Sequence, residues 1–269
     1  MPGHGVVGGG WQVAHVLTFD GLLTAFDDYR PAAPVAPTAC AELEELTGGM
    51  VPGRVWIVVS VPGEGRTTLL TQWAAEIANR PEMTVHLVTP REPPAVIVTR
   101  LLAYTGRLPL NHLSPARSEE IRPEHLARAR GLVEALSLCL YAMGEDNYVP
   151  EIHPFRAAMK PTAVIIDDAD LVSGITPAAV ADLAKAGLFV LLSLPRHQVL
   201  QAAWDEADLD PVWARAADVI LEVRHRGLPD GELRPGEAEL KVCHNRWGPI
   251  RTIQLLHQAH YSRFVEEVL

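Results

Sequence analysis

The feature that most constrains the fold of this chain is an apolar strand pattern that runs directly into a glycine-containing loop and a helix. Residues 54–60 read RVWIVVS, a nearly continuous apolar run that is typical of a buried parallel strand. The next segment, SVPGEGRTT at 60–68, resembles the phosphate-loop pattern GxxxxGK[ST], with Ser60 at the first Gly position and Arg66 at the Lys position. The sequence therefore predicts a phosphate-binding loop, although this motif alone also fits a glycine turn that binds nothing.

The residue types in this loop suit phosphate binding. Gly63 and Gly65 allow the backbone to turn its N–H groups toward phosphate oxygens, and a helix that begins at Thr67 directs its positive end toward them. The hydroxyl of Thr67 is placed to bind Mg²⁺. The expected nucleotide-binding residues are Ser60, Pro62, Gly63, Glu64, Gly65, Arg66, Thr67 and Thr68.

A second part of the site follows another apolar run. The segment 162–168 reads TAVIIDD, so that Asp167 and Asp168 come directly after a buried strand. In phosphate-loop enzymes an acid at this place orients Mg²⁺, whereas in a protein without a nucleotide such acids only cap a turn. Because the same chain supplies a phosphate loop, we favour ATP and Mg²⁺ as ligands, with Thr67 and Asp167 as the metal-binding pair.

Strand and helix patterns alternate along the chain, which predicts an α/β fold with a mostly parallel central sheet and helices on both faces. The tail reads instead as a β-hairpin, 238–244 and 250–257, around a turn at 247–249. Strands are expected at 54–60, 84–89, 162–166, 188–193 and 218–223, and helices at 67–79, 94–104, 123–136 and 177–186, the last capped by Thr176 and followed by Gly187.

The N-terminal region has a different composition. Residues 1–17 are glycine-rich, 18–30 have a short helix pattern, and 31–40 read PAAPVAPTAC, in which the prolines block a helix. We therefore expect a flexible N-terminus with a helix at about 18–30 over residues 1–35, followed by one domain over 36–269.

Composition excludes some classes of protein. The net charge of −10 disfavours a simple basic nucleic-acid binder, but it does not exclude a ring with a locally basic channel. No apolar run approaches the length of a membrane span, and the N-terminus is a poor secretory signal. Three widely spaced cysteines, Cys40, Cys139 and Cys243, argue against a disulfide scaffold or zinc site and favour the cytoplasm.

Several segments in the same order resemble the C-terminal motor domain of the DnaB family of replicative helicases. They cover nearly all of 36–269 and include PTACAELEELTGGMVPG, SVPGEGRTT, AVIVTRLLAYTG, AVIIDDADL and FVLLSLPR. The most specific part is ADVILEVRHR followed by GEAELKVCHNRWGPIRTIQLLHQAHYSRF.

The resemblance implies a RecA-like ATPase that acts in DNA replication as an ATP-dependent motor on single-stranded DNA. It also implies a ring, with six subunits by resemblance, in which the helix at 18–30 docks on a neighbouring subunit, and contacts with other replication proteins. The alternative is a catalytically degenerate relative that binds nucleotide and acts as an assembly or regulatory partner. A recombinase- or clock-type RecA relative is a third option, which the hairpin argues against.

Only some of the catalytic residues that the family implies are present in this chain. Asp167 matches the family's Mg²⁺-orienting acid, but Arg66 replaces the Lys, and Leu194 lies near the position of the family's sensor Gln. The position of the catalytic Glu aligns with Arg91; Glu92 is adjacent, and alternation in an extended segment predicts that the two point opposite ways. We expect ATP hydrolysis to be slow for the family.

The resemblance also assigns residues outside the phosphate loop. His244 and Arg246 match two basic hairpin residues that reach a neighbouring subunit's γ-phosphate, and strand alternation predicts that they share a face. His257 falls near the family's aromatic residue at the nucleotide base, although a packed hairpin histidine fits equally well. The segment 197–216, which matches the DNA-contacting loop, contains Arg215 but four acidic residues, which favours an ordinary solvated loop.

Overall fold

The computed structural model describes residues 40–142, 162–199, 210–227 and 233–267. The helix expected at 18–30, nearly all of the proline-rich linker and the middle of the loop 197–216 lie outside these residues. The domain boundary between residues 35 and 36 therefore stays a prediction.

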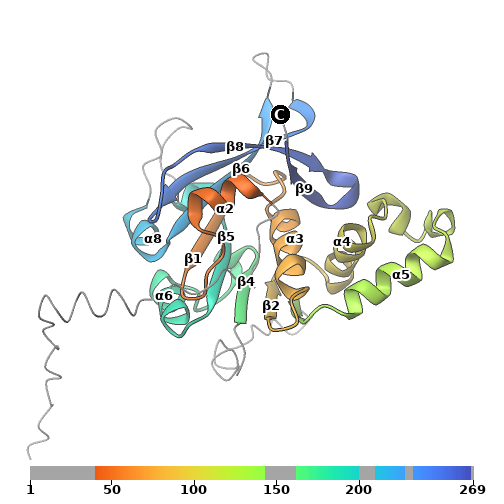
Figure 1. Cartoon of the computed structure of the whole chain (residues 1–269), viewed down its shortest axis with the longest axis horizontal. Helices are drawn as coiled ribbons and strands as arrows, with labels where there is room; N and C mark the ends of the chain where they lie inside the picture. Colours follow the sequence, from red (N-terminus) through yellow and green to blue (C-terminus); the bar gives the residue numbers. More distant parts are fainter. Residues whose placement is uncertain (1–39, 143–161, 200–209, 228–232, 268–269) are drawn as a thin grey trace, which may run out of the picture. The chain divides into compact units, whose positions relative to one another are not determined.

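A nine-stranded sheet organises the described part of the chain (Figure 1). Its strand order is β3-β2-β4-β5-β1-β6-β7-β8-β9, and all pairings from β3 to β6 are parallel, while those from β6 to β9 are antiparallel. The parallel strands are β1 (Val55–Ser60), β2 (Thr84–Thr89), β3 (Leu138–Ala142), β4 (Thr162–Ile166), β5 (Phe189–Pro195) and β6 (Val219–Gly227). The antiparallel strands are β7 (Leu233–Asn245), β8 (Thr252–Gln258) and β9 (Arg263–Glu266). The expected mostly parallel α/β sheet with a C-terminal hairpin is thus confirmed.

Helices cover both faces of the sheet. The α-helices are α2 (Ala41–Thr47), α3 (Arg66–Ala78), α4 (Pro94–Gly106), α5 (Pro123–Glu134), α6 (Pro177–Lys185), α7 (Arg196–Val199) and α8 (Pro211–Ala216). Short 3₁₀ turns lie at η1 (Leu110–Leu113), η2 (Ser118–Glu120), η4 (Ala169–Leu171) and η5 (Ala259–Tyr261). Proline lies in the first turn of α4, α5, α6 and α8. It is favoured there because a backbone N–H in the first turn has no partner within the helix, so proline loses no hydrogen bond by lacking one. Across the described ranges no helix is long and apolar enough to span a bilayer.

The core has two halves because successive side chains of a strand point to opposite faces. On β1, Trp56 and Val58 join the cluster that includes α3, whereas Val55, Ile57 and Val59 join the cluster that includes α6. Trp56 makes edge-to-face ring contacts with Trp73 and Phe189, at centroid distances of 6.2 and 5.8 Å. Because β1 is buried on both faces, the loop that follows it begins from a rigid position.

The last strand is tied to the helix that follows the glycine loop. The backbone N–H of Phe264 donates to Gln72 Oε1 at 2.7 Å, and Gln72 Nε2 donates to the carbonyl of Phe264 at 3.0 Å. The side-chain amide of α3 therefore pairs with β9 as a neighbouring strand would. This contact brings the ring of Phe264 against the glycine loop.

Candidate functional site

The glycine loop joins β1 to α3, which begins at Arg66, one residue earlier than expected. Gly63 and Gly65 have φ values of +92° and +91°, a left-handed conformation that favours glycine. A Cβ atom on Gly65 would lie 2.7 Å from Phe264 Cζ and 3.7 Å from His257 Cε1. Gly65 is therefore required both by its backbone conformation and by the side chains that surround it.

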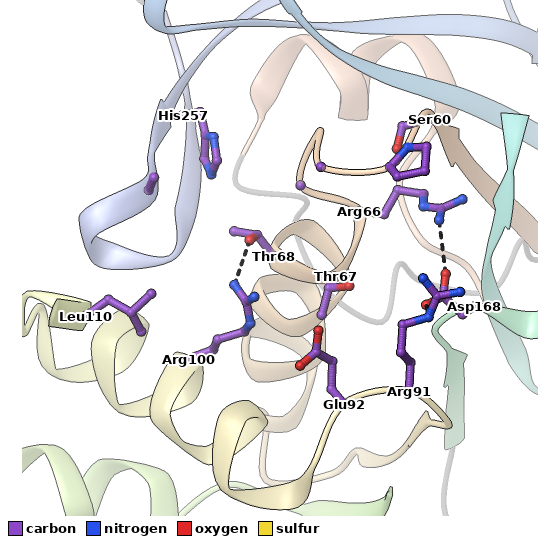
Figure 2. A pocket seen from close by; sticks show the side chains of 14 residues that line it. Ser60, Arg66, Thr67, Thr68, Arg91, Glu92, Arg100, Leu110, Asp168 and His257 are labelled. Carbon is purple, nitrogen blue, oxygen red and sulfur yellow. Dashed lines mark hydrogen bonds and ion pairs between the residues drawn. The ribbon is translucent and has the colours of Figure 1, made fainter. Parts of the chain in front are cut away.

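A cavity of about 350 Å³ opens beside this loop and the first turn of α3 (Figure 2). Its wall combines the loop, the segment after β2, Asp168 after β4, and the end of β8. The lining residues are Ser60, Pro62, Gly63, Gly65, Arg66, Thr67, Thr68, Arg91, Glu92, Arg100, Leu110, Asp168, His257 and Ala259. The cavity thus lies beyond the C-terminal ends of parallel strands, where ligands bind in open α/β sheets.

Thr67 and Asp167 are in direct contact at this end of the sheet. Thr67 Oγ1 donates to Asp167 Oδ2 at 2.6 Å, and Ser193 Oγ donates to Asp167 Oδ1 at 2.6 Å. Among the described residues, no group of three or more His, Cys, Asp or Glu side chains could hold a metal ion. A Mg²⁺ ion at Thr67 and Asp167 would therefore take most of its ligands from phosphate oxygens and water, as Mg²⁺ commonly does.

Two arginines converge on one carboxylate, that of Asp168. Arg66 Nη2 donates to Asp168 Oδ1 at 3.0 Å, and Arg91 Nε lies 3.2 Å from Asp168 Oδ2. Burial, followed by the neighbouring Asp167 carboxylate, raises the pKa of Asp168, while both arginines act in the opposite direction. Arg66 Nη1 is buried and has no hydrogen-bond partner within the described part of the chain. A buried donor without a partner is uncommon in folded proteins, and an anion bound next to Arg66 would satisfy it.

Arg91 and Glu92 both line the cavity, so the prediction that only one of them faces it is wrong. Strand β2 ends at Thr89 and the chain bends over residues 90–92, where the alternation of an extended strand no longer applies. In Figure 2 the carboxylate of Glu92 points toward Thr67, and the guanidinium of Arg91 lies at Asp168. A carboxylate is therefore available in the cavity despite Arg91.

His257 occupies the wall across the cavity from Arg66 (Figure 2). Its ring stacks on Phe264 at a centroid distance of 4.3 Å and an interplanar angle of 12°, and the ring of His225 lies 5.0 Å away. Burial, and then the charges of His225 and Arg100, lower the pKa of His257 to about 4. The imidazole is therefore neutral at neutral pH and offers an uncharged ring edge to a ligand.

His244 and Arg246 lie outside the cavity lining. His244 belongs to β7, but this strand ends at Asn245, so the argument from strand alternation does not extend to Arg246. The guanidinium of Arg246 donates to the carbonyl of Arg215 at 2.9 Å and lies 3.5 Å from Asp218 Oδ1. Burial, and then the charge of Arg246, lower the pKa of His244. The role of both residues at a neighbouring subunit stays a prediction.

The cavity also contains residues that the sequence did not assign to nucleotide binding, among them Asp168, Arg100 and Leu110. Asp168 was visible as the second acid after a buried strand. Arg100 lies on α4, and its Nη1 donates to Thr68 Oγ1 at 3.2 Å. This contact joins two helices that are distant in sequence, and no local pattern indicates it.

The chain is similar in sequence to a family of known proteins. The family described as the DnaB-like helicase C terminal domain matches residues 36–177, just over half of the chain. The chain is 26% identical over 254 residues to the replicative DNA helicase DnaB of Leifsonia xyli subsp. xyli (strain CTCB07), covering 86% of this chain and 55% of that protein. It thus spans about half the length of that curated relative.

Two solved structures share the fold. One is a DnaB-like replicative helicase, described with its interactions with primase; it has a TM-score of 0.75 and 17% identity, over 92% of this chain and 68% of that chain. The other is an ATPase domain with a TM-score of 0.73 and 16% identity, over 93% of this chain and 98% of that chain. At these identities the likeness concerns the fold, which is RecA-like as the sequence predicted.

Proposed function

Because this chain belongs to the family of DnaB-like helicase C-terminal domains, we propose that it is an ATP-binding motor domain that acts on single-stranded DNA in replication. The observation that carries the proposal is the contact between Thr67 and Asp167 beside a glycine loop with an unpaired Arg66 nitrogen. These groups suit a metal-bound polyphosphate, since a hydroxyl and a carboxylate are ligands for Mg²⁺ and a guanidinium donates to phosphate oxygens.

Each part of the proposed site has a distinct task. The backbone of residues 60–68 surrounds the phosphates, Thr67 and Asp167 hold Mg²⁺, and Arg66 donates to a phosphate oxygen. Bound Mg²⁺ would supply neutralisation of phosphate charge. Glu92 lines the cavity, and its proposed role is to orient or deprotonate the attacking water; a carboxylate there supports a motor over a relative that binds nucleotide without hydrolysing it.

Binding of nucleotide is expected to raise the melting temperature. At a nucleotide concentration 100 times Kd, mass action adds about 2.7 kcal/mol of stability, or roughly 5–10 °C for a domain of this size. Thr67→Ala should remove most of the Mg²⁺-dependent part, because the metal loses its hydroxyl ligand. The measurement is thermal unfolding with ATP or ADP, with Mg²⁺ or with a chelator.

The matched control for this test is Thr105→Ala, since the Thr105 hydroxyl donates to the carbonyl of Leu101 within α4, away from the cavity lining. This variant should keep the full response to Mg²⁺ and nucleotide. No shift of the unmodified protein at millimolar nucleotide would contradict the proposed site.

We further propose a cytoplasmic ring, hexameric by resemblance, in which Arg246 reaches the nucleotide of a neighbouring subunit. The side chain of Arg246 is 46% exposed and does not line the cavity of its own subunit. Such a residue needs a second subunit to meet a nucleotide. Single-stranded DNA and other replication proteins are the proposed partners of this ring.

Mixing two inactive variants tests the shared site. Arg246→Ala and Thr67→Ala proteins should each hydrolyse ATP poorly, whereas a mixture should recover part of the activity, because some interfaces then pair an intact Arg246 with an intact loop. Light scattering should report assemblies of the full-length chain with Mg²⁺ and ATP. A chain that stays monomeric at tens of micromolar, or a mixture that gains nothing, would contradict the ring.

A further inference from the structure

Two positively charged side chains lie on the side of the cavity next to the glycine loop. Arg66 and Arg91 both line it, and each guanidinium contacts a different oxygen of Asp168. Two guanidinium groups that contact one carboxylate would repel each other without this anion between them. The side chain of Asp168 is only 8% exposed, so this carboxylate is screened little by water.

The contacts with Asp168 use one nitrogen of each arginine. Arg66 uses Nη2 for the carboxylate, and its buried Nη1 has no partner among the residues that the structure describes. Arg91 uses Nε, and its side chain is 59% exposed. Figure 2 shows both guanidinium groups gathered at Asp168 on the side of the cavity next to the glycine loop.

Asp168 is itself held in place. Its backbone is left-handed, with a φ of 44°, a conformation that aspartate tolerates better than most residues. Its N–H donates to Ser193 Oγ at 2.8 Å, and the same hydroxyl donates to Asp167. The carboxylate that orients the arginines is therefore connected through Ser193 to the acid of the proposed metal site.

We propose that Asp168 is a positioning residue that holds Arg66 and Arg91 together as a two-arginine clamp for the terminal phosphates of a nucleotide. Arg66 stands at the position that is Lys in the phosphate-loop pattern, and its long planar group needs a second anchor to present one nitrogen inward. Asp168 supplies this anchor, so its contribution depends on arginine at position 66. The inference rests on the proposed nucleotide site.

A double-mutant cycle tests this dependence. Binding of Mg²⁺–ATP and Mg²⁺–ADP is measured by calorimetry for the unmodified protein, Asp168→Asn, Arg66→Lys and the double variant. Asp168→Asn should weaken ATP binding about 10-fold or more, the size expected for a lost hydrogen bond between charged groups. In the Arg66→Lys protein the same change should weaken binding by no more than about 2-fold, because the ammonium needs no such anchor and the remaining partner of Asp168, Arg91, is 59% exposed, so that its ion pair contributes little. Asp170→Asn, at an exposed aspartate two residues away, is the matched control and should bind normally.

Each other outcome has a definite meaning. Equal or tighter binding by Asp168→Asn would overturn the inference, since the carboxylate would then be idle or would compete with phosphate. An equal loss in the Arg66→Lys protein would also overturn it, because Asp168 would act without Arg66. Failure of the unmodified protein to bind would instead refute the proposed function, and this inference with it.

If Asp168→Asn unfolds below the assay temperature, Asp168→Glu provides the second variant. Its longer side chain keeps the charge but displaces both guanidinium groups, so ATP binding should weaken several-fold. Unchanged affinity of Asp168→Glu would contradict a positioning role.

Discussion

Gly65→Ala is expected to abolish nucleotide binding and to lower the melting temperature by roughly 5–15 °C. The new methyl group would face two costs: a φ of +91° that L-residues rarely adopt, and a distance of 2.7 Å to Phe264 Cζ. Together the backbone strain and the overpacking amount to about 2–4 kcal/mol. Relief of the clash would displace the loop or the stacked rings of Phe264 and His257, so the loop conformation proposed to hold phosphate would be lost.

Substitutions at two other glycines distinguish the cost of backbone strain from the cost of the steric clash with Phe264. Gly187→Ala, with a φ of +88° and no atom within 4 Å of the added Cβ, should lower stability by only about 1 kcal/mol and leave nucleotide binding unchanged. Gly63→Ala, with a φ of +92° and equally open space, carries only the strain within the loop itself. If Gly65→Ala is no less stable than Gly187→Ala, the contact of Phe264 with the loop is not as the structure has it. Melting temperatures and calorimetric binding of ATP measure both effects.

Glu92→Gln is expected to lower ATP hydrolysis about 100-fold or more while nucleotide still binds. The carboxylate of Glu92 faces the cavity beside Thr67, and it is the one carboxylate lining that cavity, in the described residues, that is not held by arginines (Figure 2). Glutamine keeps the size and the hydrogen bonding of this side chain but cannot accept a proton from water. Single-turnover hydrolysis and calorimetry separate the chemical step from binding.

The control for this prediction is Glu82→Gln, which makes the same change at an exposed glutamate outside the cavity and should leave the rate unaltered. The unmodified protein itself is expected to be slow, because Arg91 places a positive charge beside the proposed base. A rate that Glu92→Gln does not change would show that water is activated elsewhere. If no variant alters the rate of hydrolysis, the nucleotide would serve assembly of the protein rather than movement along DNA.

The strands that are buried on both faces were predictable from sequence. The run at 54–60 became β1, shifted by one residue, and TAVII became β4 with the bounds expected. In a chain of this composition, a short continuous apolar run has few alternatives to becoming a buried central strand. β3 and β9 were not predicted, since β3 is an edge strand that pairs only with β2, and β9 is four residues long. Pairing with distant partners, rather than local pattern, decides their structure.

The sequence predicted those parts of the candidate site that a backbone conformation or a fixed residue spacing defines. It did not predict the parts in which a bend of the chain sets the direction of a side chain. Gly63, Gly65 and Thr67 follow from the loop pattern, and their conformations and contacts fit the ligand that the pattern suggests. The alternation of strands failed at Glu92 because β2 ends at Thr89, three residues before it. The contacts of Asp168 with Arg66 and Arg91 join residues that are distant in sequence, so no local pattern indicates them.

The pairing of Gln72 with β9 has a consequence for how the protein is made. The glycine loop and α3 lie in the first third of the chain, but the cavity wall across from Arg66 belongs to His257, whose ring stacks on Phe264, the residue that Gln72 holds. A ribosome must therefore synthesise almost the whole sequence before this wall exists, and the closure of so long a loop is slow compared with local folding. A growing chain that has completed β1, α3 and β4 has the proposed phosphate and metal ligands without the far wall. We expect newly made protein to acquire firm nucleotide binding as one of its last steps of maturation.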